Sequence, residues 1–410
     1  MPDLSPSDIE RLRRDTPGCA AVCHLNNAGS ALSPSPVMAE IRHHLDLEER
    51  LGGYEAAEER REAIEATYGD VAALLGTTAD HVAIVENATV GFAQAMSAFD
   101  FRPGDTIVTT RNDYISNQLL YFSLRDRLGV QVLRAEDLPE GGVDPDSVRR
   151  LVRQPGVKVV AVTWVPTNSG LVQDAEAVGA VCEDAGIPYV VDACQVVGQL
   201  PIDVSRLRCD YLSATARKFL RGPRGIGLLY VSPRALAAGA VPLYPDMQGA
   251  RWTGPDAWTV VPTARRFENW EFAYALVLGL GAAARYAAGV GVTAGGRRAA
   301  MLAARLRTGL SAIDGVTVLD RGSTRCAITT MTSSSLDGPA LQAALRRDAV
   351  HVSVIRREHA MIDMTDKGAA SGIRLSPHYY NTESEVDRAV ATVAAAQREP
   401  SPAPRISQSA

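Results

Sequence analysis

Between about Asn87 and Val231, short apolar runs alternate with stretches whose apolar residues recur at helical spacing. Strands that are apolar along their whole length and separated by helices are typical of a parallel sheet covered on both faces. In such sheets ligands bind beyond the carboxyl ends of the strands, so the polar residues that follow each strand are the candidates for chemistry. The pattern predicts strands at Val82–Val85, Thr106–Thr110, Val157–Val165, Pro188–Val191, Tyr211–Ser213 and Gly227–Val231, and helices at Val90–Phe99, Asn117–Leu128 and Ala175–Ala185.

The last third of the chain predicts a second domain. Ala273–Ala288 and Arg297–Leu310 read as long helices that lead into it, and within it Ile328–Met331 predicts a strand and Pro339–Arg347 a helix. The expected division is an N-terminal segment packed on the small domain at 1–24, a large domain at 25–284, a small C-terminal domain at 285–396 and a disordered, Pro- and Ser-rich tail at 397–410.

Composition narrows the class of protein. The 42 basic and 47 acidic residues give a net charge of -5 that is spread along the 410 residues, which disfavours a nucleic-acid partner. No apolar run reaches the ~18 residues of a membrane span, and the first residues lack the apolar centre of a signal peptide. The six cysteines lack metal-site spacing and predict reduced thiols without a metal. We expect a cytoplasmic protein that binds a small molecule and has no nucleic-acid or membrane partner.

Lysine is rare in this chain, which limits any chemistry that needs an amine. The three lysines are Lys158, Lys218 and Lys367. Lys218 follows a predicted strand and lies among hydroxyl and arginine side chains that can neutralise a phosphate. Nearby cations and partial burial lower the pKa of an amine and favour imine chemistry. Lys158 lies at the start of a strand and Lys367 in an exposed-looking loop, so Lys218 is the candidate nucleophile.

Polar residues also follow three other predicted strands. Asp192 ends an apolar strand, where a carboxylate needs a partner such as a protonated pyridine nitrogen, and Gln195 comes three residues later. Ala88 and Thr89 open a helix whose backbone N–H groups can hold a phosphate. Tyr114 offers a ring that can stack on a planar cofactor. Each residue alone also fits an ordinary role as a helix cap, a surface acid or core packing. It is their order along the chain that favours a cofactor site.

With these motifs, above all Val191–Gln195, Ser213–Gly227 and Gly372–Thr382, the chain resembles the class V aminotransferase family of pyridoxal-phosphate (PLP) enzymes over about residues 25–395. The resemblance implies PLP as cofactor and the α/β fold of fold-type I aminotransferases. That fold has a large PLP-binding domain, with a mostly parallel seven-stranded sheet between helices, and a smaller α+β C-terminal domain. The resemblance also implies a homodimer with shared active sites.

The resemblance further implies roles for individual residues. Lys218 carries PLP as a Schiff base and moves the substrate's Cα proton, Asp192 pairs with the pyridine nitrogen, and Gln195 hydrogen-bonds the phenolic oxygen. Arg374 clamps the substrate carboxylate, a task that suits a bidentate guanidinium, and Asn26 is a second candidate for substrate binding. The remaining cofactor contacts are implied at Ala88, Thr89, Tyr114, Thr215, Arg217, Thr167 and Asn168, with the choice between the last two left open.

The branch of the family sets the reaction. No cysteine lies between Ala327 and Arg374, where a desulfurase needs a mobile thiolate to accept sulfur, so we disfavour cysteine desulfurase. The motifs most resemble ergothioneine-type and lincosamide-pathway C–S lyases, which favours β-elimination from an S-substituted cysteine conjugate in natural-product or thiol metabolism. Decarboxylation-coupled deamination of such a conjugate, epimerisation or racemisation of an amino acid, and transamination stay open. A degenerate PLP fold without activity is a further alternative.

Overall fold

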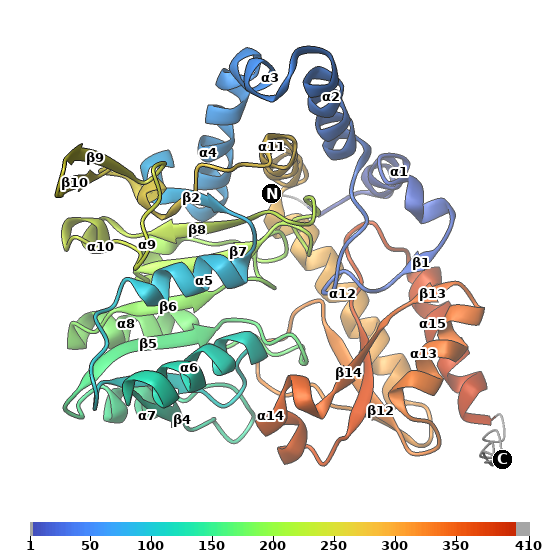
Figure 1. The fold of residues 1–410 in the computed structure, drawn as a ribbon. Helices are drawn as coiled ribbons and strands as arrows, with labels where there is room; N and C mark the ends of the chain where they lie inside the picture. The colour runs from blue at the N-terminus through green and yellow to red at the C-terminus, as the bar shows by residue number, and fades with distance from the viewer. Residues whose placement is uncertain (1–2, 399–410) are drawn as a thin grey trace, which may run out of the picture.

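The structure, a computed structural model, describes residues 3–398 and is built around one large and one smaller sheet (Figure 1). The large sheet has seven strands in the order β2-β8-β7-β6-β5-β3-β4. Strand β8 is antiparallel to both of its neighbours, and the other pairs are parallel. The expected α/β fold with a mostly parallel sheet is therefore confirmed. The strands are β2 (Val82–Val85), β3 (Thr106–Thr110), β4 (Gln131–Ala135), β5 (Val157–Thr163), β6 (Tyr189–Asp192), β7 (Tyr211–Thr215) and β8 (Gly227–Val231).

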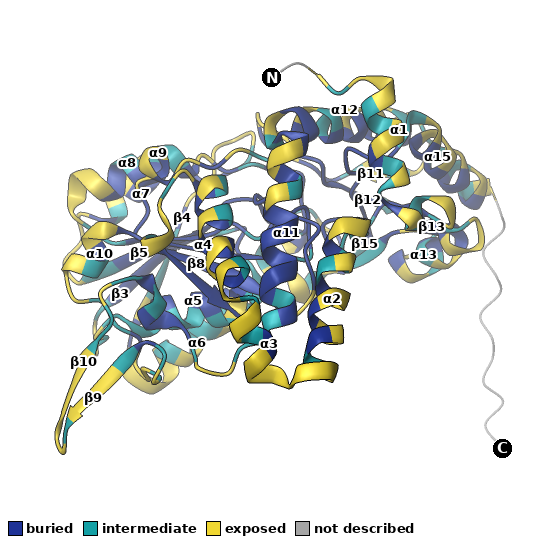
Figure 2. Cartoon of the chain, turned by 90° about the horizontal axis from the view of Figure 1, so that it is seen from above, coloured by how far each residue is buried: buried dark blue, intermediate teal, exposed yellow. Residues whose placement is uncertain are grey.

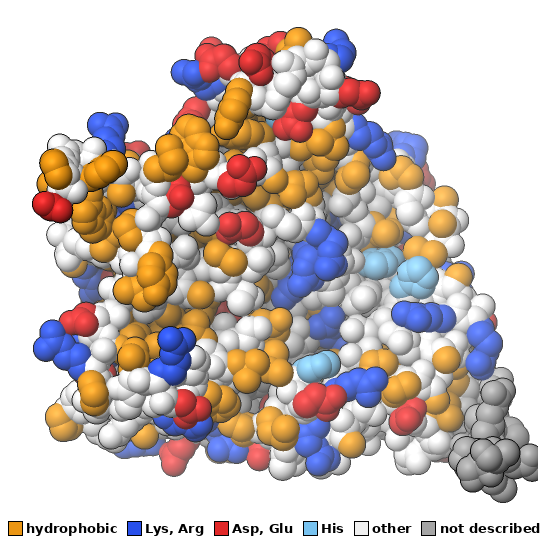
Figure 3. Space-filling model, viewed as in Figure 1, with side chains coloured by type: hydrophobic (Ala, Val, Ile, Leu, Met, Phe, Trp, Pro, Cys, Tyr) orange, Lys and Arg blue, Asp and Glu red, His pale blue; other side chains and the backbone are white. Residues whose placement is uncertain are grey.

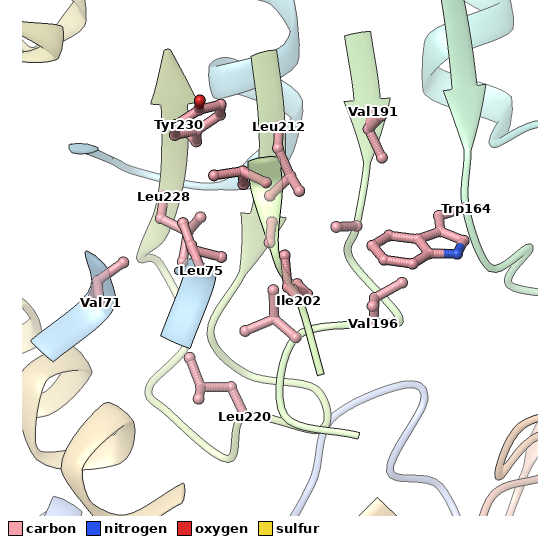
Figure 4. Packing of buried hydrophobic residues seen from close by; sticks show 14 of the residues in the cluster. Val71, Leu75, Trp164, Val191, Val196, Ile202, Leu212, Leu220, Leu228 and Tyr230 are labelled. Atoms are coloured by element: carbon pink, nitrogen blue, oxygen red, sulfur yellow. The ribbon is translucent and has the colours of Figure 1, made fainter. Parts of the chain in front are cut away.

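Both faces of this sheet are buried, which explains why its central strands are apolar throughout. On β6, Val190 packs into one core and its neighbour Val191 into the other. Figure 4 shows part of the core that contains Val191, where Leu228 of β8 lies beside Leu75. The Val190 core contains α5 (Ala88–Ser97) and α6 (Ile115–Leu128), and the Val191 core contains α4 (Arg61–Leu75), α8 (Ala175–Ala185) and α11 (Tyr274–Val290).

The smaller sheet is antiparallel, in the order β11-β12-β15-β14, and has its own apolar core. Leu302, Leu306 and Leu310 recur every four residues on one helix face and are fully buried in that core. The expected smaller α+β unit is present. Its elements are α12 (Val292–Ser311), β11 (Val316–Val318), β12 (Thr329–Ser333), α13 (Gly338–Arg347), β14 (Ser353–Arg356), α14 (Met361–Asp366), β15 (Ser371–Leu375) and α15 (Glu383–Arg398).

The proposed domain boundaries stay predictions. Of the expected tail at 397–410, residues 397 and 398 form the end of α15, and the rest lies outside the described residues. One strand of the large sheet, β4, was not predicted because it is a half-exposed edge strand without an apolar run. In the small sheet β12 was predicted, whereas β11, β14 and β15 were not. No single helix among residues 3–398 is long and apolar enough to cross a membrane. Helices α11 and α12 reach that length and hydropathy only as a pair, which is bent by 78°.

The remaining elements lie around these two sheets. The hairpin β9–β10 projects from the large sheet with an exposed surface, and α11 is mostly buried (Figure 2). These elements are α1 (Pro6–Arg14), β1 (Cys23–His24), α2 (Ser35–Leu51), α3 (Gly53–Glu59), α7 (Pro145–Leu151), α9 (Val204–Leu207), α10 (Pro233–Ala237), β9 (Ala250–Gly254), β10 (Ala257–Val260) and β13 (Val350–His351).

Candidate active site

A cavity of about 260 Å³ lies at the carboxyl ends of β3, β5, β6 and β7. This is the edge at which the sequence places its polar residues, because parallel strands bring their carboxyl ends together. Figure 3 shows Lys and Arg side chains gathered in a hollow near the middle of this face. Nine of the predicted site residues line the cavity: Ala88, Thr89, Tyr114, Thr167, Asp192, Gln195, Thr215, Arg217 and Lys218.

Lys218 lies in a tight turn that leaves β7. The turn is closed by hydrogen bonds from Arg221 N to Lys218 O (2.9 Å) and from Gly222 N to Ala216 O (2.9 Å). The lysine side chain is buried, and burial lowers the pKa of its amine. A lower pKa keeps more of the amine neutral and nucleophilic, as imine chemistry requires.

Arg221, which the sequence analysis did not single out, anchors this turn. It is 1% exposed and adopts a positive φ of 63°. Its guanidinium donates to Leu32 O (2.9 Å), Tyr379 Oη (2.9 Å) and Thr16 Oγ1 (2.6 Å). These partners come from the N-terminal segment and the loop after β15. Because these partners lie far from Arg221 in the sequence, no local pattern indicated its role.

Asp192 ends β6 and is buried at the cavity edge. Its Oδ1 accepts a hydrogen bond from Cys194 N (2.9 Å) and its Oδ2 accepts one from Asn117 Nδ2 (3.2 Å). The carboxylate is therefore held from two sides and is ready to face a protonated ring nitrogen. Asn117 is another residue of this site that the sequence did not reveal.

Gln195 has a buried polar atom, Oε1, that has no hydrogen-bond partner within the described residues. Its Nε2 donates to Ala28 O (3.0 Å) and Thr167 Oγ1 (3.1 Å), while its Oε1 is buried without a hydrogen-bond partner. Leaving a buried acceptor unpaired costs ~1–3 kcal/mol, so the site fits a group that brings its own polar atoms. The Asn168 side chain does not line the cavity and donates instead to Asp363 Oδ2 (2.5 Å), so Thr167 is the better placed of the two open candidates.

The N-terminus of α5 forms one wall of the cavity. The Asn87 side chain accepts from Val90 N (3.0 Å) and the Asn87 carbonyl from Gly91 N (3.0 Å). The N–H groups of Ala88 and Thr89 are therefore left for an anion, as at other helix N-termini. Arg217 reaches the same cavity and also donates to Gly29 O.

Tyr114 lies beside the lysine, whereas the predicted substrate residues Arg374 and Asn26 are not among the residues that line the cavity. The Tyr114 ring centroid lies 5.9 Å from Lys218 Nζ. Arg374, on β15 of the small sheet, donates to Thr167 Oγ1 (2.7 Å) and Asn26 Oδ1 (3.2 Å), and burial lowers its pKa to about 10. Its Nε is buried without a partner. A buried guanidinium with an unused donor fits a carboxylate ligand.

A family model described as aminotransferase class V matches residues 23–389. The chain belongs to the class V aminotransferase family. A relative from Mycobacterium leprae, named "Probable cysteine desulfurase 2", is 29% identical over 411 residues that cover 95% of this chain and 97% of the relative. The cysteine desulfurase structure from Thermococcus onnurineus NA1 matches with a TM-score of 0.87 at 24% identity, over 96% of this chain and 99% of that one.

Two structures of the cystine C–S lyase C-DES match with a TM-score of 0.82 at 22% identity. They cover 93% and 92% of this chain and 98% and 99% of theirs. One holds glycine covalently linked to PLP, and the other holds the reaction product cysteine persulfide.

PLP is the cofactor of this class V enzyme. The cavity fits it through three features: the buried amine of Lys218, the carboxylate of Asp192 and the free N–H groups at the start of α5. When bound, PLP supplies an electron-withdrawing ring to an amino acid joined to its aldehyde. The individual residue contacts given above stay proposals.

The preference for a thiol-conjugate lyase over a desulfurase is wrong. Relatives matched over almost the whole chain are named cysteine desulfurases, and so are solved structures with the same fold. The absence of a cysteine between Ala327 and Arg374 bears on where sulfur goes after it leaves the substrate. It does not bear on which amino acid the site binds, and the expectation treated these two questions as one.

Proposed function

We propose that this protein removes sulfur from L-cysteine and passes it to a thiol that enters from solution. The likeness to cysteine desulfurases along almost the full chain carries the proposal. In this reaction the cysteine sulfur bonds to the acceptor sulfur, the Cβ–S bond breaks, and Cβ gains a proton. Cysteine and a thiol thus give alanine and a persulfide without an added oxidant or reductant.

The size of the cavity supports a small substrate. Pockets for drug-sized ligands enclose roughly 300–1,000 Å³. The cavity of about 260 Å³ lies just below that range and is partly open to solvent, which suits a cofactor together with a small amino acid. Cysteine adds only a thiol beyond the amino-acid backbone atoms, and it suits this volume.

The chain's own residues have distinct tasks in this proposal. Arg374 binds the substrate carboxylate and thereby orients Cα, while Lys218 Nζ takes and returns the Cα proton. Asp192 keeps the ring nitrogen protonated. Arg217 and the start of α5 balance the phosphate charge.

A solution acceptor is favoured because the site offers no suitable thiol of its own. Cys194 lines the cavity, but burial raises the pKa of its thiol, whereas a sulfur acceptor needs the thiolate. The segment before Arg374 is also held in place, because Asp363 accepts hydrogen bonds from both Asn168 and Lys367 Nζ (2.7 Å). The side chain of Lys367, which forms this ion pair, is 3% exposed, in contrast to the exposed loop expected from the sequence.

The test is turnover of L-cysteine by the purified holoenzyme with and without added small thiol. We expect alanine and persulfide in equal amounts, at a rate that rises with thiol concentration. Pyruvate and ammonia in place of alanine would refute the proposal, and so would full activity without added thiol. A Cys194→Ala variant should keep the thiol-dependent activity, because Cys194 is not the acceptor.

We also propose a homodimer. Large apolar side chains gather on and beside the β9–β10 hairpin, where Trp252 is 83% exposed, Tyr244 81% and Leu243 63%. The hairpin protrudes with an exposed surface (Figure 2), and an apolar patch on such an element is typical of a protein–protein contact. Light scattering should give about twice the 43.7 kDa of the chain, and a monomer at micromolar concentration would contradict the proposal. A cytoplasmic location stays a prediction.

A further inference from the structure

Asp113 is a buried carboxylate directly before Tyr114 that none of the roles above uses. It is 7% exposed and follows the end of β3. Five donors surround its two oxygens: Thr109 Oγ1 (2.8 Å), Gln118 Nε2 (3.0 Å), Tyr114 N (2.7 Å), Asn117 Nδ2 (3.2 Å) and Thr163 Oγ1. Burial raises the pKa of Asp113, and hydrogen bonds from Thr163 and Thr109 oppose that rise. So many donors around one carboxyl group favour its charged form.

This carboxylate is connected to Asp192 through one amide group. Asn117 Nδ2 lies 3.2 Å from Asp113 Oδ1 and 3.2 Å from Asp192 Oδ2. An amide nitrogen carries two hydrogens, so it can donate to both carboxylates at once. Thr163 provides a second connection, because it donates to Asp113 and is the direct neighbour of Asp192 across the β5–β6 pair.

The same side chain also fixes the aromatic wall of the cavity. Asp113 accepts from Tyr114 N, and its contacts to Asn117 and Gln118 hold the first turn of α6, at which Tyr114 is the N-cap. One carboxylate therefore holds both the acid at the cavity edge and the backbone from which the Tyr114 ring projects.

We propose that Asp113 is a positioning residue that orients Asp192 and Tyr114 around the PLP ring. The orientation of Asp192 matters because a carboxylate held against the ring nitrogen favours the protonated form of that nitrogen. The inference rests on PLP as the cofactor and holds whichever bond of the substrate is cleaved.

The test compares Asp113→Asn with a second buried aspartate, Asp210, which directly precedes β7. Asp210 is 3% exposed, accepts from Tyr189 N (2.9 Å) and Ser232 Oγ (3.1 Å) and pairs with Arg234 (2.6 Å), but it does not line the cavity. Two readouts are used: the dissociation constant of PLP, and the pH midpoint at which the visible absorption band of the bound cofactor changes. We expect Asp113→Asn to weaken PLP binding at least about tenfold and to shift the midpoint. Asp210→Asn should lower Tm and leave both readouts within about twofold of the parent.

A second variant keeps the proposal testable if Asp113→Asn does not fold. Asn117→Ala removes the bridge and leaves Asp113 with its other four donors. It should shift the pH midpoint in the same direction. The proposal is overturned if the folded variants of Asp113 and Asn117 have a lower Tm but bind PLP with the parent's affinity and show the parent's pH midpoint. It is overturned equally if Asp210→Asn shifts the midpoint as far as they do, since the effect would then report loosened packing alone.

Discussion

Gly198 lies against the turn that carries Lys218, and a single added methyl group tests how tightly that turn is positioned. Gly198 is buried in the segment after β6 and has a φ of +90°. A Cβ at this position would lie less than 3.0 Å from backbone atoms of Phe219 and Leu220, the two residues that follow Lys218. Backbone atoms cannot rotate away as a flexible side chain can, so one of the two segments must move by roughly 1 Å to restore normal contact.

Two costs are expected in Gly198→Ala. The positive φ costs an alanine ~1–2 kcal/mol, and the overlap with backbone adds ~1–3 kcal/mol of packing strain. A shift of about 1 Å in a catalytic group can lower the rate ~100-fold. Either segment that moves carries a cavity residue, Gln195 on one side or Lys218 on the other.

Gly239→Ala separates these effects. Its φ of +81° imposes a similar backbone cost, and nothing lies within 4 Å of its Cβ position. Turnover of cysteine and the free energy of urea unfolding should be measured for both variants. We expect Gly239→Ala to lose only stability and Gly198→Ala to lose ~100-fold in kcat/KM as well. If the kcat/KM values of the two variants agree within about threefold, the lysine turn is not held by this contact and the reasoning is refuted.

Three further changes test other parts of the site and fold. Lys218→Ala should abolish the borohydride-dependent attachment of PLP to the chain, measured by mass spectrometry, whereas Lys158→Ala, which removes a pair with Asp105 (3.8 Å), should retain it. Arg374→Lys should raise KM for cysteine ~10–100-fold, because an ammonium cannot make the bidentate contact to a carboxylate; an unchanged KM would argue against the clamp. Burial raises the pKa of Glu268 to about 7, above its ordinary value, because the folded state favours the protonated form. The stability that this form contributes is present at low pH and is lost as pH rises through 7. Between pH 5 and 8 the free energy of urea unfolding should fall by up to ~3 kcal/mol less in Glu268→Gln than in the parent. The same pH dependence of this free energy in both proteins would contradict the prediction.

The sequence predicted the large sheet well because its central strands are buried on both faces. β2, β3 and β8 were bounded correctly, since an apolar run that is buried along its whole length begins and ends where the strand does. β4 was missed because this edge strand, unlike β2 at the opposite edge, is half solvated and carries no such run. The pattern on single strands also could not show that β8 runs antiparallel, because direction depends on pairing between strands.

For the site, the sequence determined which groups exist and tertiary structure decided how they are held. A rare lysine, an acid that ends an apolar strand and a hydroxyl at a helix start are local features, and nine of the predicted residues meet at one cavity. The supports of these groups are not local. Arg221 reaches Thr16 and Tyr379, Arg374 reaches Asn26, and Asn117 connects Asp113 to Asp192. Hydrogen bonds between residues far apart in sequence leave no periodic pattern, so only the folded chain brings such partners together.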